Sequence, residues 1–318
     1  MRNLMQRFLT ALCLLSFLHG GFLAAQLNSR DTFERKEGKL RVISFGAHPD
    51  DAEIRTGGAA LLWGELGHEV AFVSTTTGEG GHWQEMGTLL AKRRYDEVQK
   101  AAEILGVKSF VWGVRGGEIE ANLENRYRFV RAIRQWKADL VIAHRPNDYH
   151  PDHRYTGVLM QDSAFIVNVP NVCPDTELLE KIPVFLFSYD EFQNPPFRVD
   201  IAVALDDVIE KKLDALMVIE SQFVEGGALG YMDPRYAKAK TDQKLREELR
   251  AESREMYRKR FAKWADVSRE KLIELYGQEI GSKIKYAEPF ELCPYGRPEG
   301  EKLSAKEIEF LFPFITKK

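Results

Sequence analysis

The sequence predicts an α/β fold in which helices cover both faces of a mostly parallel sheet and a C-terminal helical extension follows. From about residue 40 to 225, short runs rich in β-branched and aromatic residues alternate with amphipathic stretches of helical length, which indicates successive strand–helix units. From about 236 to 277 the chain is charged and helix-prone, as expected of helices packed on the surface of a core. No linker rich in Pro, Gly or Ser separates these parts, so residues 26–318 are expected to form one domain.

Six strands and five long helices are expected in the first part. The strands are assigned to residues 39–45, 68–74, 109–113, 139–144, 183–188 and 199–203. The helices are assigned to residues 54–67, 88–106, 122–137, 152–167 and 206–223. A later segment, 284–292, can add an edge strand. Because crossovers between parallel strands are right-handed, the strand-to-helix loops of this Rossmann-like sheet meet at one edge, where open α/β sheets bind their ligands.

The composition is that of an ordinary soluble globular protein. The 318 residues are 44% hydrophobic and 29% charged, and the formal net charge is −3. Lys and Arg are interspersed with Asp and Glu, so no surface for a phosphate backbone is expected and nucleic acid is not an expected partner. Beyond the N-terminal segment the cysteines are Cys173 and Cys293. They could form one disulfide, but their spacing does not decide whether they do.

The first 25 residues have the pattern of a secretory signal peptide. Arg2 and Arg7 flank the start of an apolar run from Phe8 to Leu18, and small residues follow up to Ala25. The run is shorter than the roughly 20 apolar residues that span a bilayer. We therefore expect cleavage after Ala25 and no stable membrane anchor afterwards, with a retained anchor as the alternative. The mature protein is expected to be secreted or periplasmic.

Histidines and aspartates concentrate in two loops at the predicted ligand-binding edge. The first strand ends in Ala-His-Pro-Asp-Asp-Ala-Glu at 47–53, and the fourth strand leads into Asn-Asp-Tyr-His-Pro-Asp-His at 147–153. Four of the six histidines beyond residue 25 lie in or beside these loops, namely His48, His144, His150 and His153. Core packing does not need such a concentration of polar groups. The two loops therefore indicate a metal-binding or catalytic site.

These side chains suit the hydrolysis of an amide at a zinc ion. Two imidazoles and a carboxylate are an established catalytic ligand set that leaves one position open for water or substrate. A carboxylate that does not bind the metal can take a proton from water, and an imidazole can stabilise the oxyanion or protonate the amine. Neighbouring side chains of an extended segment point opposite ways, so Asp50 and Asp51 can divide these roles. Spacing alone does not settle which of His150 and His153 binds the metal.

The paired motifs resemble those of the PIG-L/LmbE-like N-acetylglucosaminyl deacetylases. Ala-His-Pro-Asp-Asp at 47–51 is followed about a hundred residues later by His-Pro-Asp-His at 150–153. The pair Gly57-Gly58 and the Thr-x-Gly-x-x-Gly loop at 76–81 are also similar to this family. The resemblance covers roughly residues 40–225. It implies a zinc-dependent enzyme that removes an N-acetyl group from an amino sugar.

Carried over onto the matching positions, the resemblance implies a role for each residue of the two motifs. One zinc ion per chain would be bound by His48, Asp51 and His153. Asp50 would be the general base, His150 the oxyanion-stabilising or acid residue, and Asp152 a carboxylate that supports a histidine. Arg94 would contact the substrate. Iron(II) suits the same ligand set as zinc.

Some of these residues also have a structural interpretation. Asp50 could cap the helix that follows it, and His150 could be an exposed surface residue. Arg94 could be a salt-bridge partner on its helix. His144, at the end of a buried strand, could be a structural histidine or could touch the site.

The pocket around the metal is less well determined by the sequence. His82 and Trp83 follow a glycine-rich loop and could either form the rim of a substrate pocket or pack on the surface. Ala52 precedes Glu53 where some members of the family place the glutamate directly after the second aspartate. Arg55 stands where the family commonly has a small residue. These departures bear on the shape of the pocket and leave the metal ligands in place.

The expected function is zinc-dependent removal of an N-acyl group from an amino sugar or sugar conjugate. Acetyl is the acyl group that we expect. The expected partner is therefore a small molecule or glycan that carries an N-acetyl group. No serine or cysteine lies in a nucleophile elbow, so water is expected to attack directly. One alternative is a zinc amidohydrolase that acts on another small acylated amine. Another is a carbohydrate-binding protein without catalysis, against which Asp50 argues, because a binder needs no base beside a metal.

Overall fold

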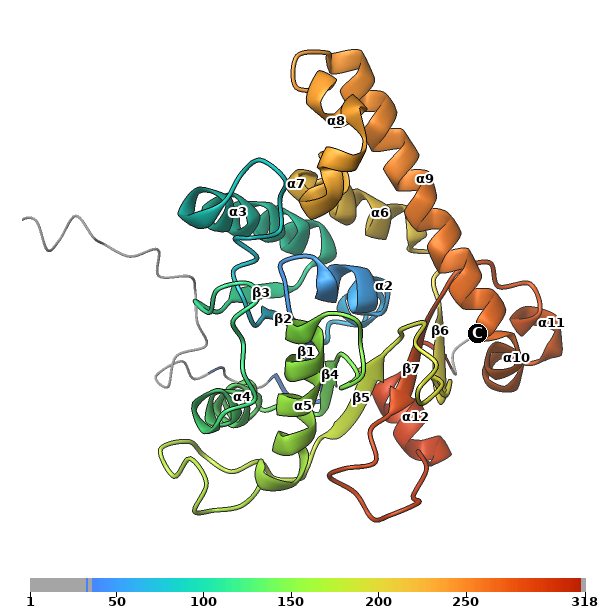
Figure 1. Cartoon of the computed structure of the whole chain (residues 1–318). Coiled ribbons are helices and arrows are strands. Elements are labelled where there is room, and N and C mark those ends of the chain that lie inside the picture. The colour runs from blue at the N-terminus through green and yellow to red at the C-terminus, as the bar shows by residue number, and fades with distance from the viewer. Residues whose placement is uncertain (1–32, 34–35, 316–318) are drawn as a thin grey trace, which may run out of the picture.

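A seven-stranded sheet runs through the part of the chain that the structure, a computed structural model, describes: Phe33 and residues 36–315. Its strand order is β3-β2-β1-β4-β5-β7-β6 (Figure 1). The strands are β1 (Arg41–Gly46), β2 (Glu69–Ser74), β3 (Lys108–Val111), β4 (Leu140–Ala143), β5 (Val184–Ser188), β6 (Ile201–Ala204) and β7 (Ala287–Leu292). The predicted signal peptide, residues 1–25, lies outside the described residues. Among the described helices, none combines the length and the apolar character needed to cross a membrane.

The five strands β1 to β5 are parallel to their neighbours, as the sequence predicts. The prediction that residues 284–292 form an edge strand is wrong. Instead, β7 lies inside the sheet and pairs antiparallel with both β5 and β6. Its side chains are buried on both faces, Glu288 and Phe290 on one and Ala287 on the other. The edge position belongs to β6.

Helices cover both faces of the sheet. The helices preceding the C-terminal extension are α2 (Asp51–Glu65), α3 (Gly87–Leu105), α4 (Leu123–Trp136), α5 (Pro151–Ile166), α6 (Ile209–Met217) and α7 (Glu220–Phe223). One buried cluster joins the sheet to α2, α3 and α6, and another joins it to α4 and α5. Cys173 and Cys293 are buried in the second cluster as free thiols, so they are not joined by a disulfide.

The C-terminal part is helical, as predicted, and packs against the first cluster. It comprises a short 3-10 helix η1 (Gly227–Met232), then α8 (Pro234–Lys238), α9 (Gln243–Val267), α10 (Arg269–Tyr276), α11 (Gln278–Gly281) and, after β7, α12 (Ala305–Leu311). The long helix α9 runs along one side of the molecule (Figure 1). It buries Tyr257, Phe261 and Trp264 on its inner face, so it is part of the core as well as a surface helix.

The two histidine-rich loops meet because β1 and β4 are neighbours in the sheet. Val42 of β1 is paired with Leu140 of β4. From β1 the chain continues through α2 to β2 on one side, whereas β4 lies on the other side. Such a reversal of strand order opens a crevice beyond the carboxyl ends of the strands. Helices α2 and α5 both begin at this crevice, at Asp51 and Pro151.

Candidate metal centre and active site

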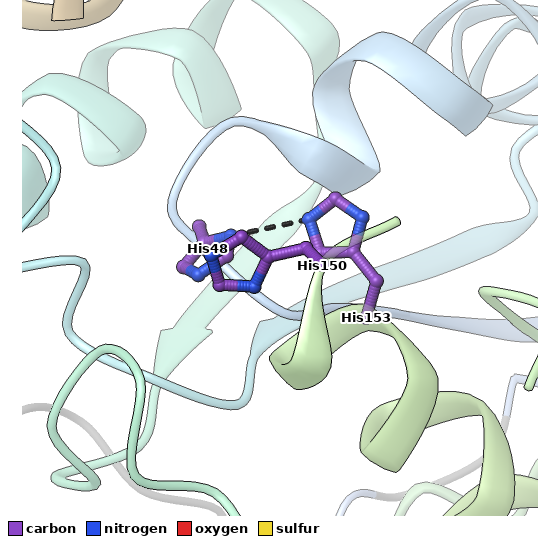
Figure 2. Close-up of side chains that lie close together, drawn as sticks. All are labelled: His48, His150 and His153. Atoms are coloured by element: carbon purple, nitrogen blue, oxygen red, sulfur yellow. Dashed lines mark hydrogen bonds between the residues drawn. The ribbon is translucent and has the colours of Figure 1, made fainter. Parts of the chain in front are cut away.

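Three side-chain atoms from the two loops form a nearly equilateral triangle. His48 Nδ1 lies 3.4 Å from Asp51 Oδ2, and this oxygen lies 3.3 Å from His153 Nε2. His153 Nε2 lies 3.2 Å from His48 Nδ1, the contact dashed in Figure 2. Zinc–nitrogen and zinc–oxygen bonds of about 2.0–2.1 Å in a tetrahedron separate the ligand atoms by about 3.3 Å. The predicted ligands His48, Asp51 and His153 therefore have the spacing that a zinc ion requires.

The electrostatics of the triangle also suit a cation. Burial lowers the pKa of His48, but the carboxylates of Asp152 and Asp51 outweigh it and raise this pKa to about 10. Burial would raise the pKa of Asp51, yet the neighbouring His153 and His144 hold it well below its usual range. Positive charge is thus favoured between these groups. A metal ion would supply that charge in place of protons on the imidazoles.

The outward-facing nitrogen of each predicted histidine ligand lies against a carboxylate. His48 Nε2 is 3.0 Å from Asp152 Oδ2, which also accepts the Gly117 N–H at 2.6 Å. His153 Nδ1 is 3.1 Å from Asp148 Oδ1. Such contacts fix the tautomer and orientation of metal-binding imidazoles. Asp152 thus contacts His48, where a supporting carboxylate is predicted, and Asp148 contacts His153, which the sequence did not reveal.

Two other groups of residues could also hold an ion. One is Asp51 with His144 and His153, and the other is His48 with His150 and His153. His144 stacks on His153 with 4.1 Å between ring centroids, and its Nε2 lies 3.3 Å from Asp51 Oδ2. However, His144 Nε2 also accepts the N–H of Ala47 at 3.2 Å, which uses the lone pair that a metal would need. His144 touches the site, but His48 is the better placed ligand.

His150 lies beside the triangle with one ring nitrogen already used. Its Nδ1 accepts the N–H of Asp152 at 3.1 Å, which caps helix α5. The other nitrogen, Nε2, must then carry the proton of the neutral ring. Its side chain is 32% exposed, lines the cavity and meets the His48 ring edge-on at 4.6 Å. Burial and the charge of His48 lower its pKa, so His150 is a neutral hydrogen-bond donor near neutral pH.

Asp50 lies beside the triangle and its carboxyl group makes no capping contact. It occupies the N-cap position of α2, yet its side chain accepts no hydrogen bond from the helix. The residue is only 6% exposed and lines the cavity. Burial, together with the charge of Asp51, raises the pKa of Asp50 to about 6. A carboxyl group tuned toward neutrality beside a metal site suits a general base.

Arg94 approaches the same cavity from α3. Its guanidinium donates to Gly81 O at 2.7 Å and to Gln222 Oε1 at 2.6 Å. Among the described residues no carboxylate lies within 4.0 Å of it, although the side chain is 98% buried (2% exposed). A β-carbon on Gly81 would lie 2.9 Å from Arg94 Nη1, so glycine lets the loop wrap this side chain. Arg94 is held by neutral oxygens and lines the cavity, as a substrate-binding group would be.

The structure does not bring His82 and Trp83 into the cavity. His82 Nδ1 accepts the N–H groups of Gln84 and Glu85, and its Nε2 lies 3.4 Å from Glu225. The Trp83 indole donates to the carbonyl of Glu225 at 3.0 Å. Both side chains thus fasten their loop to the segment before η1. Their substrate-binding role stays a prediction, without support from their position.

The cavity over the triangle has a volume of about 440 Å³, within the range of sites for small ligands. The end near the triangle is lined by Asp50, Arg94 and His150. Tyr149, 66% exposed, lies at this end as well. Residues of α9 and of the segment after β5 also line the cavity. The sequence did not point to these residues, because they are far from both motifs along the chain.

Comparisons with known proteins agree with this geometry. The PIG-L family, described as GlcNAc-PI de-N-acetylase, matches residues 43–164. Diacetylchitobiose deacetylase of Thermococcus kodakarensis is 31% identical over 194 residues, which cover 58% of this chain and 71% of that protein. The matched region includes both histidine-rich loops.

Solved structures share the fold at lower identity. N,N'-diacetylchitobiose deacetylase from Pyrococcus horikoshii superposes with a TM-score of 0.61 at 24% identity, over 84% of this chain and 88% of that one. The 4-carboxy-2-hydroxymuconate hydratase from Pseudomonas putida superposes with a TM-score of 0.63 at 20% identity, over 84% and 100% of the two chains. The predicted α/β fold is confirmed. Because two different activities occur on it, the function must be argued from the site.

Proposed function

Because the chain belongs to the PIG-L family of de-N-acetylases, we propose that it is a zinc-dependent hydrolase that removes an acetyl group from the nitrogen of an amino sugar or sugar conjugate. The observation that carries this proposal is the triangle of His48, Asp51 and His153 with a fourth group, Asp50, left unbound beside it. A zinc ion there would polarise the amide carbonyl and lower the pKa of a water molecule.

The chain's own residues then divide the remaining work. Asp50 takes a proton from the attacking water, and its raised pKa of about 6 leaves it ionised at neutral pH yet basic enough to do so. His150 donates its Nε2–H to the oxygen that becomes negative as the carbonyl carbon turns tetrahedral. The proton held by Asp50 can pass to the amine as the carbon–nitrogen bond breaks. Acetate and a free amine result.

The proposed substrate class rests on similarity and on cavity size. The relative from Thermococcus kodakarensis is named for its action on diacetylchitobiose. A cavity of about 440 Å³ accommodates one or two sugar rings. Exposed and half-buried aromatic rings at its mouth, those of Tyr149 and Phe192, offer apolar surface on which a sugar ring can lie.

The test is acetate release from N-acetylglucosamine glycosides, compared with N-acetylated amino acids, with and without a chelator. We expect release from the glycosides, its loss on chelation and its return with zinc. An Asp50→Asn variant should keep its zinc and lose at least about 10²-fold in kcat. Equal activity on the amino acids would favour the broader amidohydrolase, and an Asp50→Asn variant with unchanged behaviour would favour a carbohydrate-binding protein.

We also propose that the protein acts outside the cytoplasm. The support is the charged and apolar pattern of residues 1–25. The mass of the protein purified from the culture medium or periplasm should correspond to a chain that begins at Gln26. A full-length chain in the cytoplasmic fraction would contradict this proposal.

A further inference from the structure

One end of the cavity includes residues from one face of α9. Tyr257, Arg260 and Trp264 follow one another at helical spacing and all line the cavity. Arg55, on the second turn of α2, lines the same end, with its guanidinium carbon 5.9 Å from the centre of the Trp264 ring. None of these residues is a predicted metal ligand, and the proposed hydrolysis gives them no role.

Among the described residues, the guanidinium N–H groups of Arg55 have no hydrogen-bond acceptor. Its side chain is only 17% exposed, and its one carboxylate neighbour within 4.0 Å is Asp148, at 3.9 Å. That distance is too long for a hydrogen bond, and Asp148 is already in contact with His153. Among the described residues, Arg55 forms no hydrogen bond. A largely buried guanidinium in this state is stabilised by any anion that reaches it.

Arg260 is the second cation at this end of the cavity. Its guanidinium lies 5.0 Å from the centre of the Tyr257 ring, and no ion pair or hydrogen bond to it occurs among the described residues. Contact with an aromatic ring uses the face of a guanidinium and leaves the N–H edge free. The same holds for Arg55 over Trp264. Two arginines therefore present free N–H edges to one end of the cavity.

The acidic residues of this end do not neutralise the charge of the two arginines, because they are paired with other basic side chains. Asp190 is bound by Arg145 through two hydrogen bonds, of 2.8 and 2.6 Å. Glu191 is paired with Lys263 at 3.0 Å. In addition, the buried indole N–H of Trp264 has no hydrogen-bond partner among the described residues. Within the described part of the chain, this end of the cavity thus carries two cations without a hydrogen-bonded partner and an unused donor.

We propose that Arg55 and Arg260 bind a negatively charged group of the substrate, a carboxylate or a phosphate, so that the preferred substrate is an acidic N-acetylated sugar conjugate. The inference rests on the proposed deacetylase function and specifies its substrate class. The planar fork of an arginine matches the two oxygens of a carboxylate or phosphate better than a single hydroxyl. The acetamide would lie at the triangle and the anionic group against α9.

The experiment compares N-acetylglucosamine glycosides that share a propyl aglycone and differ at its end: hydrogen, carboxylate or phosphate. Acetate release gives kcat/KM for each, and the ratio of anionic to neutral substrate is the readout. Arg260→Gln is the test variant. Lys259→Gln is the matched control, because Lys259 is 77% exposed on the same helix and does not line the cavity. Arg55→Lys, assayed together with zinc content, is the second test variant.

We expect wild-type protein to prefer an anionic substrate by about 10- to 100-fold, the worth of one or two charge-assisted hydrogen bonds. Arg260→Gln should reduce this ratio by at least about fivefold, and added salt should reduce it too. The carboxylate and phosphate arms show which anion fits. A wild-type ratio of one or less for both anions overturns the inference. So does an equal change in Arg260→Gln and Lys259→Gln, since the effect would then be one of net charge.

Failure of the deacetylase function is recognised separately. The dissociation constants of the same glycosides are measured by calorimetry in the zinc-loaded Asp50→Asn variant, with and without Arg260→Gln. One outcome is that wild-type protein releases no acetate while the anionic compounds still bind more tightly than the neutral one and lose this advantage in Arg260→Gln. That result would support the anion-binding subsite and contradict the proposed reaction. If acetate is released without any anion preference in rate or binding, the reaction stands and the subsite does not.

Discussion

At the residue scale, Asp50 links the geometry of the site to pH. Its carboxyl group must be ionised to act as a base, and burial with the charge of Asp51 raises its pKa to about 6. A bound cation lowers this value. We therefore predict that kcat/KM is level above about pH 6 and falls about tenfold per pH unit on an acidic limb between about pH 4 and 6.

The measurement is a pH–rate profile with zinc content determined at each pH, since protonation of the histidines also releases metal. A rate that stays constant from pH 7 to about pH 4, near the ordinary value of an aspartate, would show that Asp50 is not the base. If the fall in rate at low pH follows the zinc content alone, the acidic limb is due to protonation of the metal ligands and not of Asp50.

A second residue-scale prediction concerns Asp148. Burial would raise the pKa of this carboxyl, but its contact with His153 and the charge of His144 hold the pKa at about 2. It is therefore ionised at all working pH values. Replacing it with asparagine should weaken zinc binding by about 10- to 100-fold through loss of support for His153. Zinc affinity is measured by competition with a chelating dye.

Asp162→Asn is the matched control for this measurement. Asp162, an aspartate of α5, is likewise in contact with a basic side chain, that of Arg126 at 2.7 Å, but it does not line the cavity. Equal zinc affinity in Asp148→Asn and the wild-type protein would mean that the 3.1 Å contact with His153 has no effect on the metal.

The contact of Asp148 with His153 is an example of what the sequence could not predict. The meeting of the two motifs was predictable because each lies in the loop after a buried strand, and strand-end loops of a parallel sheet share one edge. The partner of a ligand's second nitrogen depends on ring orientation, which a motif does not specify. His82 shows the same limit: it follows a glycine-rich loop at the correct edge, yet its ring turns toward Glu225, away from the cavity.

At the scale of elements, α2 is held in place by a buried ion pair. Glu288 of β7 accepts the N–H groups of Gly58 and Ala59 at 2.8 and 2.7 Å. Lys212 of α6 pairs with Glu288 and donates to the carbonyl of Ile54 at 2.7 Å. The pair thus binds the backbone of α2 on both sides of Gly57. A side chain at Gly58 would meet Leu205 and Glu288, which explains the glycine.

We predict that Lys212→Met lowers the free energy of unfolding by about 3–5 kcal/mol, because it leaves the Glu288 carboxylate buried without its partner. Lys283→Met is the control, since the pair of Lys283 with Glu279 is exposed and its loss should cost less than about 1 kcal/mol. Urea unfolding measures both. Adding Glu288→Gln to Lys212→Met should restore part of the loss. A Lys212→Met variant as stable as the control would contradict this account.

The order of elements was predictable only in part. Alternating strands and helices up to about residue 225 follow from local periodicity, and the structure confirms this alternation, except that the predicted helix 206–223 is divided into α6 and α7. The position of β7 does not follow from periodicity, because a strand that returns after a long helical segment can join either the edge or the interior of a sheet. Its pairing with β5 on one side and β6 on the other places it in the interior. The contribution of α9 to the cavity is likewise a long-range contact without a local signal.

At the scale of the whole molecule, the proposed ion would join two parts of the chain about a hundred residues apart, the starts of α2 and α5. Any ligand that binds only the folded state stabilises it, by about 2.7 kcal/mol when its free concentration is a hundred times its dissociation constant. For a domain of this size each kcal/mol raises Tm by about 2 °C. We therefore predict that zinc raises Tm by several degrees and that a chelator reverses the shift.

His153→Ala should abolish this shift, because two protein ligands remain where zinc needs three. His68→Asn is the control, since His68 lies at the start of β2 on the opposite edge of the sheet, where its Nδ1 accepts the N–H of Leu40. Calorimetric scans with elemental analysis of the same samples separate binding from stability. Full zinc content and an unchanged shift in His153→Ala would show that the ion is held elsewhere, and the triangle of His48, Asp51 and His153 would lose its assignment.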